Sequence, residues 1–427
     1  MSLTSQLARG DLGRWFAQTM PGTTAVAAEV ADAAARVRPV RPQAGTVLGD
    51  RHWADVGGAF GARLGALVQA APPYYGLYGL VSPGLLTLRA AHEIAAGYPS
   101  HAALTPAEQL RALDMRPDPA GWRDLGRPCP DPDPDPPAWG DAVFAELAAR
   151  TRGYHDQHAP TGAVGTPGAE AGLARVYGLW SVCEDIYRSG VISPDLEELL
   201  DLDRPTVEQL RAATPVAVVD EIVGLARRLA ESGSLAALRG WAGNPEPGQP
   251  LGCAGPVFAT HWADGDLLVG DTLLDVKTVM RADQPDRTGR WLWQILAYAW
   301  LDTAGDRYRI RAAGLYLARH GVLLRWDVDE LAARLLGDRR AVAAARHEFL
   351  DLATHAATSE VPAWTREPPS AASAMSGPSS NSQCRGGAGT PAADQTAPSA
   401  GRRGRGICIP MRSGENPVPP KDGGGPG

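Results

Sequence analysis

The chain has 427 residues, of which 44% are hydrophobic, with 41 basic and 48 acidic residues and a formal net charge of −7. This length predicts two or three domains with a sizeable core. The acidic balance excludes a protein that coats nucleic acid or an anionic membrane with its whole surface, but it is compatible with a local basic groove. Five dispersed cysteines without a C-x-x-C pair argue against a disulfide framework and a cysteine-built zinc site.

Lysine is rare in this chain. Only Lys277 and Lys421 are lysines, and all other basic residues are arginine. Because the two cations are not interchangeable, a lysine inside a folded region of such a chain hints at lysine chemistry. The N-terminal residues lack the apolar segment of a secretory signal, and no apolar run approaches the ~18–20 residues of a membrane helix. We therefore expect a cytoplasmic protein without a membrane partner.

The first half of the chain is expected to be mainly helical. Residues 1–128 contain alanine-rich stretches with apolar residues at helical spacing, at Thr24–Val37, Asp55–Ala70 and Leu85–Ala96. An Asp/Pro-rich segment, 129–137, predicts a stiff linker. A second helical region, 138–214, is expected to contain helices at Trp139–Arg150, Gly168–Arg188 and Thr206–Ala213.

The pattern changes in residues 215–366, where short aliphatic runs alternate with helical segments. A helix is expected at Ala217–Glu231 and another at Gly289–Thr303. Strands are expected at Pro256–His261, Asp266–Val269, Thr272–Val279, Ala312–Arg319 and Val322–Trp326. Gly270-Asp271 and His320-Gly321 are hairpin signals. A last helix, Val328–Thr358, is expected to break near Gly337, and residues 367–427 are expected to be disordered because they offer too little apolar surface to bury.

Charged residues cluster around the hairpin that contains the folded lysine. Side chains two residues apart on a strand share a face, so Asp275 and Lys277 point the same way. The turn at Gly270-Asp271 folds the preceding strand back, which brings Asp266 toward them. Two carboxylates suit Mg²⁺, and a lysine beside that ion and a phosphodiester can orient water or stabilise developing charge.

These residues carry a family resemblance. Asp266, followed nine residues later by Asp275-Val276-Lys277-Thr278 and then by Q-x-x-x-Y at Gln294–Tyr298, resembles the RecB-like branch of the PD-(D/E)xK nuclease superfamily. The resemblance covers about residues 215–326. It implies a restriction-endonuclease-like αβββαβ core of the α/β class in the domain 215–366, beside the helical N-terminal region and the disordered tail.

The resemblance also implies roles for single residues. Asp266 and Asp275 would bind Mg²⁺ or Mn²⁺, Lys277 would be the catalytic lysine, and Gln294 and Tyr298 would shape the site or contact nucleic acid. The family often adds a helix glutamate as a metal ligand, for which Glu221 is the first candidate and Glu184 the second. The chain departs from the pattern in lacking a proline before the first acid. In addition, Asp264 competes with Asp266 for the metal position because it shares the same strand face.

Other features admit two readings each. The segment from Lys277 to Arg325 has nine basic and four acidic residues, which fits either phosphate contacts or solvated arginines. Trp291 and Trp293 either stack bases or pack in a helix core. His261 is either a strand-end histidine or part of the site.

Three functions are therefore weighed. The first is a metal-dependent nuclease that hydrolyses phosphodiester bonds of DNA. The second is a catalytically silent module of the same fold that binds nucleic acid or supports assembly. The third is a helical protein-interaction scaffold.

Overall fold

The computed structural model describes residues 2–43, 45–46, 48–104, 137–192, 194–200, 205–259 and 262–359. These residues fall within one compact unit, 1–368. The unit combines helices with a mixed sheet, so the expected α/β class with a mainly helical N-terminal region is confirmed. The expected disordered tail, the expected linker except residue 137, and His261 lie outside the described residues.

A five-stranded sheet forms the centre of the unit, with the strand order β1-β4-β5-β6-β7. Neighbouring strands are antiparallel except for β5 and β6, which run parallel. A parallel pair needs a long crossover, and helix α15 (Pro285–Asp302) supplies it. The strands are β1 (Gly252–Ala254), β4 (Leu267–Val269), β5 (Thr272–Lys277), β6 (Ala312–Leu317) and β7 (Val322–Asp327).

The first sheet strand differs from the expectation. The segment expected as a strand at 256–261 does not enter the main sheet, because β2 (Val257–Ala259) pairs only with β3 (Ala263–Asp264) in a separate two-stranded ribbon. The sheet edge is β1 instead. Gly255, with φ +62°, and Pro256 separate the two short strands, because the left-handed backbone and the missing N–H interrupt regular pairing.

One of the two expected hairpin turns is confirmed and the other is longer. Val269 pairs with Thr272, so Gly270 and Asp271 form a two-residue loop, and Gly270 has φ +58°. A positive φ at the first loop position is typical of a type II′ turn. Between β6 and β7, Leu317 pairs with Val322, which leaves a four-residue connection instead of two residues.

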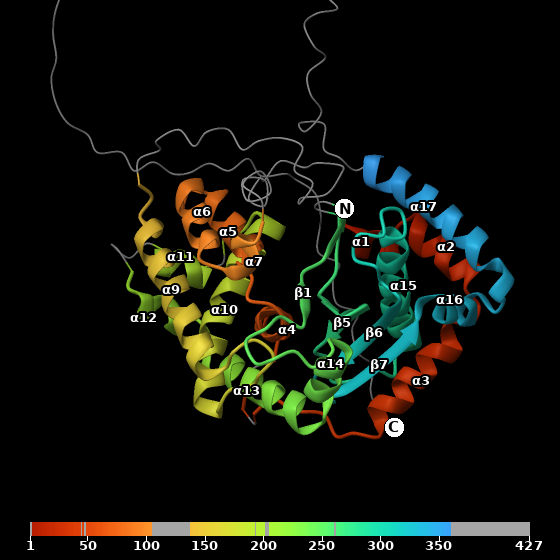
Figure 1. Cartoon of the computed structure of the whole chain (residues 1–427), viewed down its shortest axis with the longest axis horizontal. Helices are drawn as coiled ribbons and strands as arrows, with labels where there is room; N and C mark the ends of the chain where they lie inside the picture. The colour runs from red at the N-terminus through yellow and green to blue at the C-terminus, as the bar shows by residue number, and fades with distance from the viewer. Residues whose placement is uncertain are drawn as a thin grey trace, which may run out of the picture. The chain divides into compact units, whose positions relative to one another are not determined.

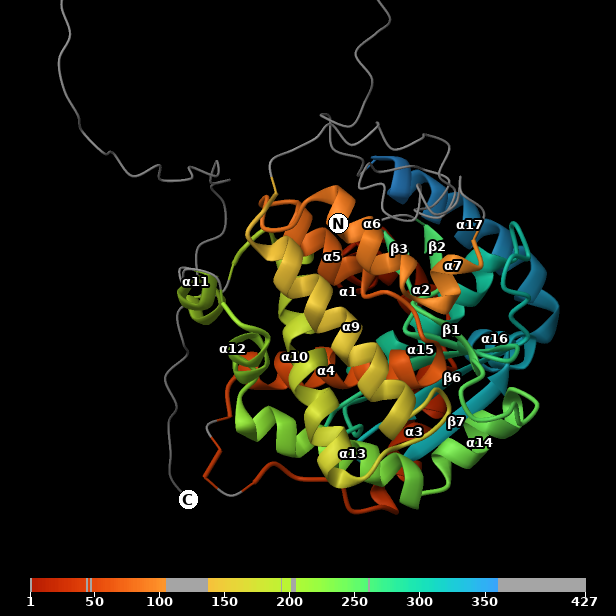
Figure 2. The same cartoon turned by 60° about the vertical axis from the view of Figure 1, so that its left-hand side comes forward.

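Helices cover both faces of the sheet (Figures 1 and 2). On one face lie α15 and the helices of both ends of the described chain: α1 (Leu3–Arg9), α2 (Asp11–Thr19), α3 (Thr23–Ala35), α16 (Val328–Leu336) and α17 (Val342–Ser359). As expected, the last helical segment breaks at Gly337, where φ is +74° and a short 3₁₀ turn, η1 (Arg339–Ala341), follows. The opposite face is covered by α4 (Asp50–Val68), α13 (Val216–Glu231) and α14 (Ser234–Trp241).

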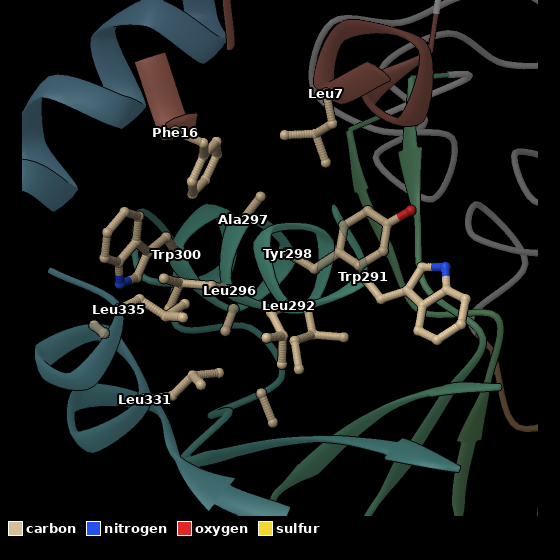
Figure 3. Close-up of a cluster of buried hydrophobic side chains, with 14 of the residues drawn as sticks. Leu7, Phe16, Trp291, Leu292, Leu296, Ala297, Tyr298, Trp300, Leu331 and Leu335 are labelled. Atoms are coloured by element: carbon tan, nitrogen blue, oxygen red, sulfur yellow. The ribbon is translucent and has the colours of Figure 1, made fainter. Parts of the chain in front are cut away.

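The core on the α15 face is rich in aromatic side chains (Figure 3). Figure 3 shows Trp291 and Tyr298 at one end of the cluster and Trp300 at the other, with Phe16 of α2 above the helix. Phe16 stacks on Trp300 with ring centroids 6.5 Å apart. Large buried rings contribute much of the apolar area that stabilises such a core. The N-terminal helices therefore belong to the same core as the crossover helix.

The remaining helices form a bundle beside the α4 side of the sheet. They are α5 (Tyr74–Val81), α6 (Leu88–Ala96), α7 (Pro99–Ala102), α9 (Gly140–His158), α10 (Pro167–Ser189), α11 (Pro194–Leu200) and α12 (Val207–Ala212). A buried bidentate ion pair joins α4 to α10, with Arg63 Nε and Nη2 each 2.8 Å from the carboxylate of Glu170. Among the described residues, no helix has the length and apolar character needed to cross a membrane.

Candidate active site

Strand β5 presents an acid and a base side by side at its C-terminal end. Leu273 packs into the core beneath α15, whereas Leu274 packs into the core on the opposite face. The period of two along a strand therefore turns Asp275 and Lys277 toward α15. The Lys277 ammonium lies 2.6 Å from Asp275 Oδ2. Asp275 is buried, while 18% of the Lys277 side chain is exposed, so the ion pair lies at the solvent boundary of the sheet.

Asp266 approaches this pair from the start of β4. The backbone N–H of Val276 donates to Asp266 Oδ2 at 2.6 Å, which places the Asp266 carboxylate beside the peptide group that joins Asp275 to Val276. Solvent reaches the side chain of Asp266, yet protein atoms crowd its carboxyl group. This desolvation and the charge of Asp275 raise the pKa of Asp266 to about 7, against the opposing effects of Lys277 and the Val276 N–H.

The pKa of the Asp275 carboxyl group is raised as well. Burial raises its pKa, and the ion pair with Lys277 opposes the rise. Two adjacent carboxylates thus share one nearby ammonium, and both hold their protons more tightly than an ordinary aspartate. A further positive charge at this point would favour the ionised form of both groups.

Helix α15 supplies the polar side chains that face Lys277. Gln294 Oε1 lies 3.4 Å from Lys277 Nζ and accepts a hydrogen bond from it. The amide nitrogen of Gln294 donates to the hydroxyl of Tyr298, 3.0 Å away, and to Thr4 Oγ1, 3.3 Å away. Tyr298 is buried, which raises its pKa, and its ring stacks on Phe258. Gln294 is therefore held by two further residues while it contacts the lysine.

The two candidates for a helix glutamate have different positions. Glu221 does not join the cluster, because its carboxylate binds the buried guanidinium of Arg319 and lies 2.6 Å from His52 Nε2. It lies on α13, on the opposite side of the sheet from α15. Arg319 also donates from Nε to the carbonyl of Thr278, the residue after Lys277. In the described part of the chain, Arg319 thus links Glu221 to the end of β5.

Glu184, the second candidate, is linked through Arg188 to Asp264 of the two-stranded ribbon. Arg188, one turn further along α10, lies 2.6 Å from Glu184 and 2.9 Å from Asp264. Burial raises the pKa of Glu184. Asp264 is engaged by this arginine, so the structure brings Asp266 rather than Asp264 to Asp275.

Five sequence-predicted residues therefore meet: Asp266, Asp275, Lys277, Gln294 and Tyr298. His52, Arg188 and Arg319 were not singled out from the sequence. Glu184 and Arg188 have the i,i+4 spacing of a helical ion pair, but the contact of Arg188 with Asp264 spans 76 residues and has no local signal.

The donor set suits a hard divalent cation with few protein ligands. Mg²⁺ is commonly held by one or two carboxylates together with water and substrate phosphate. Asp266 and Asp275 provide two carboxylates with raised pKa values at the end of the sheet. Across the described ranges, no group of three His, Cys, Asp or Glu side chains is placed to hold a metal ion. The residues fit a site that relies on water and phosphate for its remaining ligands.

Comparisons with known proteins do not extend this description. No protein-family model matches the chain, and neither a curated protein nor a solved structure matches it.

Proposed function

We propose that this protein is a metal-dependent nuclease that hydrolyses phosphodiester bonds of DNA. The observation that supports the proposal is the convergence of Asp266, Asp275 and Lys277 with Gln294 on the crossover helix. The same residue types in the same order carry the resemblance to RecB-like nucleases. A mixed sheet with a helix crossing between its two parallel strands is compatible with the core that this resemblance implies.

Lys277 is the proposed catalytic residue. Asp275 and Gln294 fix its ammonium from two directions, and part of the side chain is exposed to solvent. In this position the ammonium can orient a water molecule for attack or stabilise negative charge that develops on the phosphate. Arginine would not replace it, because the guanidinium is larger, planar and never deprotonated. This need for a compact cation accounts for a lysine at 277 in a chain that otherwise uses arginine.

Asp266 and Asp275 are the proposed ligands of Mg²⁺ or Mn²⁺. Burial raises the pKa of both carboxyl groups, and the charge of Asp275 raises that of Asp266 further, so a bound divalent cation would favour the ionised form of both. When bound, such an ion polarises a phosphoryl oxygen and lowers the pKa of water. Tyr298 acts through Gln294, whose amide nitrogen it binds, and is a positioning residue.

A cationic strip on α15 supports a nucleic-acid substrate. Arg287 and Arg290 are exposed and have no ion-pair partner among the described residues. The guanidinium of Arg287 lies 5.4 Å from the centre of the Trp291 ring, which is buried, so core packing is the role of Trp291 that the structure favours. Residues 287, 290 and 294 lie on adjoining turns, so a backbone bound along these arginines would lead toward Gln294.

The decisive experiment compares variants of the full chain in a cleavage assay. Lys277→Ala and Asp275→Asn should reduce Mg²⁺-dependent cleavage of labelled DNA by at least about 100-fold. Asp283→Asn is the matched control, because Asp283 is exposed and its ion-pair partner among the described residues is the exposed Arg281 nearby. The proposal fails if the two site variants cleave as fast as the wild type.

A second candidate is a nucleic-acid-binding module without catalysis. It is favoured by the ion pair between Glu221 and Arg319, because this pair keeps Glu221 away from the site and leaves two carboxylates there instead of three. Such a protein would bind DNA with a steep dependence on salt but would not cleave it in Mg²⁺ or Mn²⁺. Loss of affinity in Arg287→Ala and Arg290→Ala, with no cleavage by the wild type, would favour this alternative.

A further inference from the structure

A cavity of about 150 Å³ lies between α4, α5, α10 and β1. Its walls combine small residues of α4, such as Gly65, with the rings of Tyr75, Tyr98, Tyr177 and Trp180. Glu184 also lines it. The small residues add little bulk to the walls, whereas the rings provide flat apolar surface on which a planar group could stack.

Two elements connect this cavity with the acidic site. Gly255, which lines the cavity, donates its backbone N–H to the carbonyl of Asp266 at 2.9 Å. On the other wall, Glu184 is joined through Arg188 to Asp264, two residues before Asp266. The Arg188 guanidinium also lies 4.8 Å from the centre of the Tyr75 ring. The cavity is thus the immediate neighbour of the strand start that carries the first acid.

The polar groups of the cavity match the edge of a nucleobase. The carboxylate of Glu184 can accept from an amino or imino N–H. Gln69 also lines the cavity. Its Oε1 accepts a hydrogen bond from the backbone N–H of Ala254, and its amide nitrogen is a donor. Aromatic walls with one acceptor and one donor suit a base that is stacked and read along its edge.

The volume decides between a single base and a duplex. Pockets that hold drug-sized ligands measure about 300–1,000 Å³, so about 150 Å³ has room for one base and not for a base pair. We propose that this cavity binds one unpaired nucleobase of a single-stranded DNA segment next to the Asp266–Asp275–Lys277 site. The choice of a nucleobase as the ligand rests on the proposed function. The substrate class is then single-stranded DNA or an unpaired end.

Two glycines on α4 allow a matched test. A Cβ added at Gly65 meets only the Cβ of Ala254, at 3.5 Å, which is ordinary contact, so the side chain of Gly65→Leu can extend into the cavity. Gly61, one turn away on the same helix, has open space around it and does not line the cavity. Both substitutions replace a helical glycine with leucine, so their effects on helix stability should be similar.

The experiment measures binding without cleavage. The full chain with Asp275→Asn, in EDTA, is titrated into single-stranded DNA that contains 2-aminopurine, whose fluorescence falls when the base stacks. We expect quenching, stronger binding of the single strand than of a blunt duplex, and about 5- to 150-fold weaker binding in Gly65→Leu, as for the loss of one stacking contact. Gly61→Leu should bind like its parent. Tyr75→Leu, which removes one ring, should weaken binding in the same range.

Several outcomes overturn the inference. The inference fails if both leucine variants weaken DNA binding equally, or if Gly65→Leu binds DNA like its parent while its circular dichroism is native. It also fails if the protein binds the duplex more tightly than the single strand, or if an equal concentration of mononucleotide displaces the strand. Failure of the proposed function is separate, because it is scored by cleavage in Mg²⁺ with Asp275 intact. Base binding without cleavage would refute catalysis alone, and cleavage without base binding would refute the cavity assignment alone.

Discussion

Replacing Glu221 with alanine should strongly destabilise this protein. Arg319 has no measurable exposure, and 3% of Glu221 is exposed. Without the carboxylate, the guanidinium would keep its charge inside the fold, and its hydrogen-bond acceptors among the described residues would be the carbonyl groups of Thr278 and Val40. His52 Nε2 would also lose its partner at 2.6 Å.

The expected loss of unfolding free energy is about 3–5 kcal/mol, the usual result of removing one partner from a buried ion pair. This is a large fraction of the ~5–15 kcal/mol that stabilises a typical protein. Arg319→Met combined with Glu221→Leu should lose less than Glu221→Ala alone, because no uncompensated charge stays buried.

Urea unfolding in EDTA, followed by tryptophan fluorescence, measures this effect. Glu231→Ala is the matched control on the same helix, because Glu231 is exposed and its ion-pair partner within the described ranges is exposed Arg227, so it should change stability by less than about 1 kcal/mol. A loss below about 1 kcal/mol in Glu221→Ala would refute the reasoning. If Mg²⁺ stabilises the wild type but not Glu221→Ala, Glu221 is a metal ligand after all.

Three further predictions follow from the site and the hairpin. Because the folded-state pKa of Asp266 is raised above its unfolded value, its contribution to stability is present below about pH 4 and is lost as pH rises through about 7. In EDTA, Asp266→Asn should therefore gain melting temperature relative to the wild type between pH 5 and 8; an unchanged difference across this range would contradict the prediction. At pH 7.5, Mg²⁺ should raise the melting temperature of the wild type and have a smaller effect on Asp266→Asn and Asp275→Asn, as titrations by differential scanning fluorimetry would show. Gly270→Ala should destabilise the fold by at least about 1 kcal/mol, because φ is +58° and a Cβ would approach the Trp241 carbonyl to 2.3 Å; unchanged urea unfolding would count against the turn geometry.

The local features of the site could be predicted from the sequence. Alternation along a strand placed Asp275 and Lys277 on one face, and the i,i+4 spacing placed Gln294 near Tyr298. The two-residue turn at Gly270-Asp271 set the register that brings Asp266 back toward β5. These relations depend on backbone periods and short connections, which a sequence displays directly.

The contacts between distant segments were decided by tertiary packing. The family resemblance made Glu221 the first candidate for a metal-binding helix glutamate, because it lies on the helix that precedes the strands. The structure binds Glu221 to Arg319, 98 residues away, because a buried carboxylate is stabilised by the cation that the fold brings to it. Gln294 likewise donates to Thr4, 290 residues away in the sequence, because the fold brings these two segments together.

The sequence by itself determined the α/β class, most helix positions and the local grouping of the acids with the lysine, because these follow from periodicity and turn chemistry. Only the tertiary structure decided that β1 forms the sheet edge, that the N-terminal helices share the core of α15, and that Gly255 of a cavity with aromatic walls contacts the backbone of Asp266. Those features depend on which apolar faces pack against each other. A single sequence shows which face of each element is apolar, but it does not show which other element covers that face.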